Sequence, residues 1–182
     1  MLSLNTKIDL TKLLEIIGFA EVQIEKMREV LCRQSSFTVD PVFNRIARGA
    51  SPDHITDVDL LKFLQSNKVE TNLRDINLFM ADRGTSGDKC IDRADLCNLL
   101  VTKTNTKVRN EVYNRQSYRL PSNHFLNFEL EYTITRIFEY ELNLLREIQH
   151  YIFLLSEKSD FSIFDSFQEI DINFTNYYNV KE

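Results

Sequence analysis

Glycine and proline are scarce in this chain, which has four glycines and three prolines among 182 residues. All-β sandwiches and barrels need a turn about every 8–12 residues, and turns draw heavily on these two residue types. The shortage therefore favours long helices joined by few loops. Because 43% of the residues are apolar and 27% charged, the chain can bury a core. We expect an all-α protein with one domain of ordinary size or two small ones.

Cysteine is also rare. Cys32, Cys90 and Cys97 are odd in number and lack the paired spacing of a disulfide framework, which indicates a reducing compartment. Cys90 and Cys97 have no histidine near them in the sequence, which argues against a zinc site. No apolar run approaches the ~20 residues of a membrane span, and charged side chains interrupt the first twenty positions. We expect a soluble, intracellular protein without a signal peptide and without membrane contact.

Positive charge is outnumbered, since 22 basic residues face 27 acidic ones and the formal net charge is −5. This balance argues against a general nucleic-acid binder. His54, His124 and His150 lie far apart with no convergent carboxylates, so we predict no catalytic site and no enzymatic activity. One stretch carries an excess of basic residues, and two readings stay open for it: a solvated connector, or a contact for an acidic partner such as a tubulin-like surface. Its basic residues are Lys103, Lys107, Arg109, Arg115 and Arg119.

Apolar periodicity divides the chain into five segments. Residues 1–36 predict one or two amphipathic helices, with Gly18 as the possible interruption. Residues 37–101 contain two helix–loop–helix patterns, and 102–124 form a polar connector with a short helix near 108–118. Residues 125–159 predict one long amphipathic helix, whose apolar stripe either covers a core or docks on a partner helix. Residues 160–182 resemble the beginning of the first helix–loop–helix, because Phe161, Phe167 and Ile170 repeat the spacing of Phe37, Phe43 and Ile46.

These segments resemble EF-hands, the helix–loop–helix units of the calmodulin superfamily. The resemblance rests on an apolar helix, a polar loop, an isoleucine at the eighth loop position (Ile55, Ile91) and an acid four residues later (Asp59, Asp95). An EF-hand loop gives calcium six to eight oxygens, with a glycine at position six and a bidentate Glu at position twelve. The resemblance implies that the eighth residues of two hands pair through a short two-stranded ladder.

The first loop lacks calcium ligands. Ala47 or Arg48 stands where the leading Asp belongs, and Asp53 and Asp59 alone cannot form a calcium cage. The second loop keeps more: Asp82, Ser86, Asp88 and Asp95 are candidate metal ligands around Gly87. Its span from Asp82 to Asp95 is two residues too long, so we expect weak calcium binding or none.

The third loop fits the ligand pattern best on paper. Residues 171–182 read DINFTNYYNVKE, and the candidate ligands at positions one, three, five and twelve are Asp171, Asn173, Thr175 and Glu182. Asn176 can replace the turn glycine because asparagine visits the left-handed region readily. The sequence stops at Glu182, without the exiting helix of a complete hand. We expect such a half-hand to bind calcium weakly at best, and the chain to be part of a longer repeat or to end there.

The layout is similar to divergent EF-hand-pair proteins of protists, including ciliates, many of which belong to cytoskeletal or axonemal assemblies. The resemblance implies a non-enzymatic structural or docking protein, largely independent of calcium and without another cofactor. Its partners would be proteins, such as a filament, a coiled coil or a tubulin-like surface, and its location the cytoplasm, the cytoskeleton or the axoneme of a cilium. The alternative is a calcium-responsive regulatory protein. Seven phenylalanines could line a groove for a target helix, but we predict that they fill the core: Phe37, Phe43, Phe63, Phe79, Phe161, Phe164 and Phe167.

Overall fold

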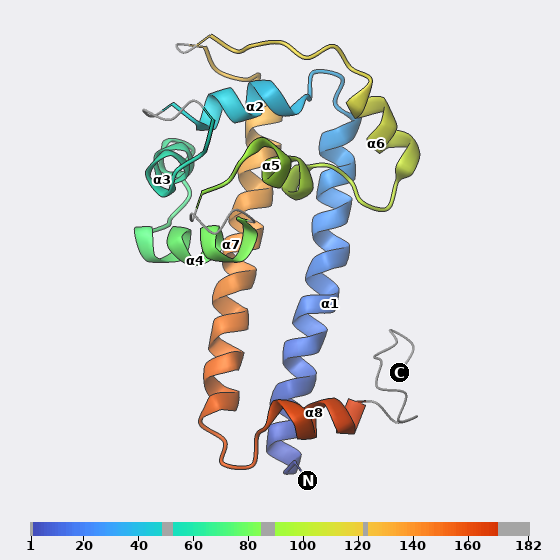
Figure 1. The fold of residues 1–182 in the computed structure, drawn as a ribbon, viewed down its shortest axis with the longest axis vertical. Helices are drawn as coiled ribbons and strands as arrows, with labels where there is room; N and C mark the ends of the chain where they lie inside the picture. The colour runs from blue at the N-terminus through green and yellow to red at the C-terminus, as the bar shows by residue number, and fades with distance from the viewer. Residues whose placement is uncertain (1, 49–52, 85–89, 122–123, 171–182) are drawn as a thin grey trace. The chain divides into compact units, whose positions relative to one another are not determined.

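The computed structural model describes residues 2–48, 53–84, 90–121 and 124–170. These ranges contain helices and one isolated β-bridge but no strand, which confirms the predicted all-α class (Figure 1). No helix within them is both long and apolar enough to span a membrane. The helices are α1 (Leu4–Arg33), α2 (Val39–Ile46), α3 (Asp57–Ser66), α4 (Leu73–Arg83), α5 (Arg93–Leu100), α6 (Thr106–Tyr113), α7 (Phe128–Ser156) and α8 (Ile163–Ile170).

The chain divides into two compact units. One comprises Glu21–Leu145, and the other comprises Met1–Ala20 together with Arg146–Glu182. The long helices α1 and α7 each contribute one end to each unit. Helix α1 runs without a break through Gly18, where an added Cβ would meet nothing within 4 Å. The sequence predicted one or two helices for residues 1–36, and the structure shows one.

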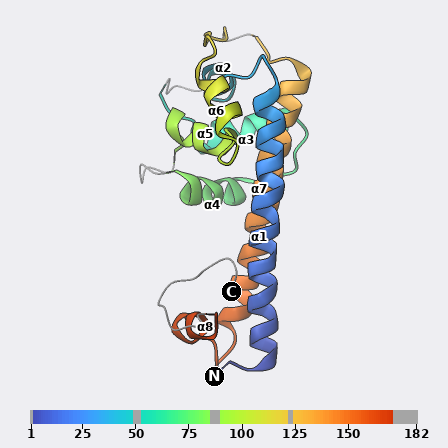
Figure 2. The same ribbon diagram turned by 90° about the vertical axis from the view of Figure 1, so that its right-hand side faces the viewer.

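In the unit Glu21–Leu145, helices α2 to α5 gather beside the C-terminal part of α1 and the N-terminal part of α7 (Figures 1 and 2). Within this group α2 packs on α5, α3 packs on α4, and α2 also contacts α3. The phenylalanines predicted for this core are buried: Phe37, Phe43, Phe63 and Phe79. Phe138 of α7 meets the rings of Phe63 and Phe79 edge-on, with centroids 6.4 and 5.7 Å away. In this unit the apolar stripe of α7 therefore covers a core, which was one of the two roles predicted for it.

The segment predicted as a polar connector contains α6, which ends earlier than the expected helix at 108–118. The segment is attached to α1 at two points. At its beginning, Oε1 of Glu25 accepts hydrogen bonds from the backbone N–H groups of Lys103 and Thr104, both at 2.9 Å, and from the Thr102 hydroxyl. Just after α6, the guanidinium of Arg115 donates to three carbonyls at the end of α1 and in the turn after it: Cys32, Gln34 and Phe37. Arg115 is therefore a structural residue.

In the other unit, Asp160 caps the first turn of α1. Its carboxylate accepts hydrogen bonds from the Ser3 N–H at 2.5 Å and from the Thr6 hydroxyl at 2.8 Å. These bonds hold the pKa of Asp160 at about 2. Phe164 and Phe167 of α8 are exposed, so the prediction that they fill a core is wrong. Among the side chains of α8 that the structure describes, Ser166 is the buried one.

Candidate functional site

The two helix–loop–helix units meet at Ile55 and Ile91. The N–H of Ile55 donates to the carbonyl of Ile91 at 2.9 Å, and the N–H of Ile91 donates back at 3.1 Å. The result is an isolated antiparallel bridge, and both side chains are buried. These are the two residues that the sequence places at the eighth position of their loops.

A capping box starts the exiting helix of each unit immediately after the bridge. Thr56 caps α3, and its hydroxyl accepts from the Asp59 N–H while the Asp59 carboxylate accepts from the Thr56 N–H. Asp92 and Asp95 repeat this exchange at the start of α5. The boxes satisfy N–H groups that have no partner within their own helix. The closing acids Asp59 and Asp95 are buried and serve here as helix caps.

The structure describes two other acidic residues considered as ligands in the first two loops, and each forms an ion pair with an arginine. Asp53 is exposed and lies 3.8 Å from Nη1 of Arg93, and Asp82 lies 3.0 Å from Nε of Arg83. Ser86, Asp88, Asp171, Asn173, Thr175 and Glu182 lie outside the described residues. Among the described residues, no cluster of three or more His, Cys, Asp or Glu side chains could hold a metal ion.

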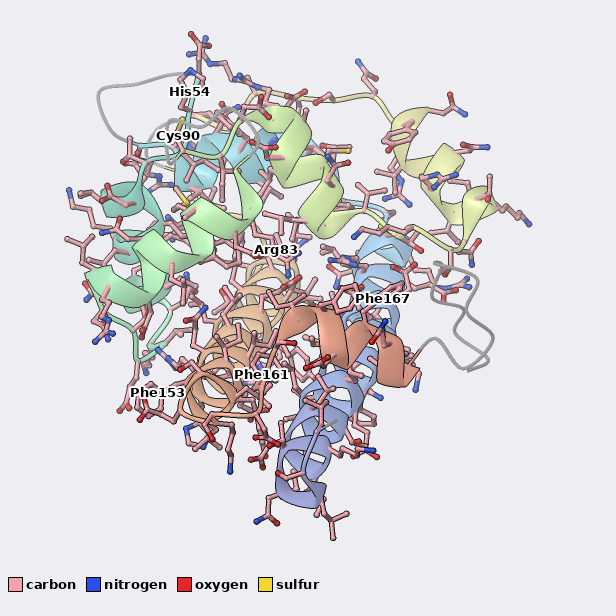
Figure 3. All side chains as sticks on the ribbon, turned by 60° about the horizontal axis from the view of Figure 1, so that its bottom comes forward. His54, Arg83, Cys90, Phe153, Phe161 and Phe167 are labelled. Carbon is pink, nitrogen blue, oxygen red and sulfur yellow. The ribbon has the colours of Figure 1, made fainter. Side chains whose placement is uncertain are left out.

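Each entering helix carries in its last turn an arginine that pairs with a glutamate of α7. In the second unit Arg83 reaches from α4 toward α7 (Figure 3) and donates to Glu141 at 2.6 Å. Glu141 also accepts from Arg28 of α1 at 3.2 Å, and Arg28 donates further to the Leu99 carbonyl. Glu141 and Arg28 are 0% and 1% exposed. Burial raises the pKa of Glu141, while the two guanidinium groups favour its charged form.

In the first unit Arg45 pairs with Glu131, and both residues line hollows in the surface. Nε of Arg45 donates to Glu131 Oε2 at 3.0 Å, and Asn67 donates to the other oxygen at 3.1 Å. The Arg45 guanidinium lies between the rings of Phe63 and Phe125, 5.2 and 4.9 Å from their centroids. Arg48 also lies over Phe125, at 5.2 Å, and donates to the His124 carbonyl. Two guanidinium groups thus hold the Phe125 ring in place.

Two adjoining hollows share Phe125 and Ser66 in their walls, and we call them together the Phe125 groove. The larger has a volume of about 480 Å³ and the smaller about 340 Å³. The larger is lined by Ser66, Asn67, Lys68, Phe125, Leu126, Phe128, Glu131, Tyr132 and Thr135. The smaller is lined by Arg45, Ile46, Arg48, Asp59, Lys62, Phe63, Ser66 and Phe125.

The sequence reasoning missed the Phe125 groove, because its walls come from segments far apart in the chain. One signal was present: Phe128 and Tyr132 are four residues apart at the start of the long helix and lie outside its buried stripe. Their rings stack with centroids 6.1 Å apart. Aromatic side chains outside the stripe of an amphipathic helix indicate a contact surface.

Comparisons of this chain with protein-family models, with curated proteins and with solved structures found no match. Its function is therefore inferred from its own residues and geometry.

Proposed function

We propose that residues 37–101 form a degenerate EF-hand pair that serves as a non-enzymatic docking module and does not depend on calcium. The observation that carries this proposal is the antiparallel bridge between Ile55 and Ile91. The EF-hand resemblance predicts one backbone contact between the two loops, at their eighth positions. The bridge lies at that contact, and a helix begins two residues after each isoleucine.

The chemistry of the loop positions supports independence from calcium. The first loop opens with Arg48, a cation, where calcium requires a carboxylate. Both closing positions hold Asp, which is one methylene shorter than the usual bidentate Glu. Both of these carboxylates already accept hydrogen bonds at the start of their own helix. Calcium would have to compete with these caps.

The packing of α7 supports docking through an outer surface. In calcium sensors the opened pair exposes an apolar interior to a target helix. Here Phe138 of α7 lies against Phe63 and Phe79, so the chain's own helix occupies the interior of the pair. Partner proteins would therefore meet the outside of the module. A cytoskeletal or axonemal setting, with a filament or a tubulin-like surface as partner, follows from the resemblance to protist EF-hand-pair proteins.

Calorimetric titration of the EDTA-treated chain with calcium tests the metal-free part. We expect no saturable heat, and no shift of the thermal unfolding midpoint when calcium is added. A binding isotherm in the micromolar range with a stoichiometry of one or more would contradict the proposal and favour the calcium-responsive alternative. In that case Asp82→Asn and Asp171→Ala, measured separately, would identify the loop that binds.

A further inference from the structure

We propose that the Phe125 groove binds a short acidic peptide segment of a partner protein, anchored by one large apolar side chain. The proposal rests on the docking function above and names the partner class for it. The groove is formed by the end of α2, by α3 with the residue that follows its cap, by Phe125 and Leu126, and by the first turns of α7.

The apolar part of the groove is a set of exposed aromatic rings. Phe125, Phe128 and Tyr132 are 68%, 86% and 56% exposed. Scattered apolar residues on a surface need no explanation, but three aromatic side chains that line one hollow form a patch. The larger hollow has room for a large side chain, because it holds about 480 Å³. Aromatic anchors of this kind dominate the affinity of protein interfaces.

The charge of the groove is positive, although the chain as a whole is negative. Its two acids are already engaged: Glu131 pairs with Arg45, and Asp59 accepts from the N–H and hydroxyl of Thr56. The exposed cations on the walls are Arg48, Lys62 and Lys68. Within the described part of the chain none of these three side chains forms an ion pair. Lys62 and Lys68 are available to carboxylates of a ligand, and Arg48 adds positive charge beside them while it donates to the His124 carbonyl.

The backbone at Lys68 also indicates that the groove is a functional site, and this indication does not depend on the aromatic rings or on the charge. Lys68 has a φ of 63°, and it is the one residue other than glycine with a positive φ in the described ranges. It follows the Asn67 cap of α3, and the hydrogen bonds Lys68 N–H to Gln65 and Val69 N–H to Leu64 form a Schellman motif. Glycine is the usual residue at this position because a Cβ is strained there. The chain keeps a lysine in a strained conformation at the wall of the groove, which is typical of functional positions.

Three exposed cations and a hollow sized for one large side chain fit a peptide better than a nucleic acid. Proteins that bind nucleic acids contact many phosphate groups with basic side chains, which is more than three cations can provide. The net charge of −5 would also repel a phosphate backbone. An acidic peptide with a central apolar residue can place that residue among the aromatic rings and its carboxylates beside Lys62, Lys68 and Arg48.

The test is fluorescence polarisation with the full chain in EDTA. The probes are fluorescein-labelled peptides of about nine residues that carry a central Trp or Leu flanked by Asp and Glu. Matched probes have Lys at the flanking positions or Ala at the centre. We expect saturable binding of the acidic probes only, and weaker binding as salt rises from ~0.05 M to ~0.5 M. Amide chemical shifts of the bound chain should change around Phe125 and Lys68.

Variants locate the site. Phe125→Ala and the double change Lys62→Glu with Lys68→Glu should each weaken binding about tenfold or more. Lys68→Gly should weaken binding and also raise the thermal unfolding midpoint, because glycine fits the backbone without strain. Lys12→Glu with Lys107→Glu, an equal charge change at exposed positions of α1 and α6, is the matched control for the double variant and should leave binding unchanged.

Four results would overturn the proposal. These are failure of every acidic probe to bind both in EDTA and in a parallel titration with calcium, shift changes located elsewhere, tighter binding of an oligo(dT) probe at the same residues, and self-association of the chain that the lysine changes abolish. Acidic binding seen only with calcium would instead contradict the calcium independence proposed above and leave the groove as the binding site.

Discussion

The two helix–loop–helix units share a plan but use it differently. Each has in the last turn of its entering helix an arginine that pairs with a glutamate of α7, each contributes one isoleucine to the bridge, and each starts its exiting helix with a capping box. In the second unit the arginine belongs to a buried network with Arg28 and Glu141. In the first unit it lies under the Phe125 groove. One scaffold thus provides an anchor in one copy and an accessible surface in the other.

Of the variants that test this difference between the two units, the one that removes the charge of Glu141 should lower the free energy of unfolding most. Glu141→Gln leaves the buried Arg28 with one carboxylate nearby, that of Glu25 at 3.7 Å, and breaking a buried ion pair typically costs about 3–5 kcal/mol. Glu131→Gln should cost roughly 1–3 kcal/mol, because Arg45 lines a hollow that water can enter. Urea unfolding followed by far-UV circular dichroism measures both free energies of unfolding.

The control for that pair of variants removes the charges of the network together. Arg28→Met with Glu141→Leu should recover most of the lost stability, because apolar replacements leave no uncompensated buried charge. Equal losses for Glu141→Gln and Glu131→Gln would show that the two arginine–glutamate pairs play the same role.

The second unit needs a glycine at the end of α4. A Cβ at Gly84 would lie 2.6 Å from the Cys90 carbonyl oxygen and 2.9 Å from that of Met80, so the backbone itself would have to shift. Gly84→Ala should therefore destabilise the chain by roughly 1–3 kcal/mol in thermal unfolding. Gly18→Ala is the matched control, in open space within α1, and should stabilise by about 0.5–1 kcal/mol. A neutral Gly84→Ala would contradict the close approach of the two carbonyls.

The smallest expected effect on stability concerns Glu25, which holds the residues that follow α5 against α1. Burial raises the pKa of Glu25, but the hydrogen bonds from Thr102, Lys103 and Thr104 outweigh it and hold the pKa at about 2. Because the pKa in the folded chain lies below the ordinary glutamate value of 4.5, these bonds stabilise the fold fully above that pH and are lost as pH falls toward 2. The stability difference between the wild type and Glu25→Gln should shrink over that range in urea titrations. A difference that stays constant between neutral pH and pH near 3 would show that Glu25 is not the titrating group.

The sequence was sufficient to predict features that depend on local spacing. The period of apolar residues located the long helix α7, and the loop pattern placed Ile55 and Ile91 at equivalent positions. Glu141 stood inside the apolar stripe of α7, and a carboxylate there signals a buried partner. The partner itself, Arg28, is distant in the sequence, so no local pattern could identify it. The same holds for Arg45 and Glu131, whose pairing depends on how α2 and α7 pack.

The two attachments of the segment between α5 and α7 to α1 also bear on proteolysis. This stretch contains several lysines and arginines, and its polar composition suggests an accessible site for trypsin. Glu25 holds its beginning and Arg115 holds it to the end of α1, with α6 between them. A protease must release several residues of backbone from these contacts before it can cleave. Residues 102–115 are therefore protected as long as α1 keeps its two attachments, whereas Arg119 lies beyond them and is exposed, so we expect trypsin to cleave there first.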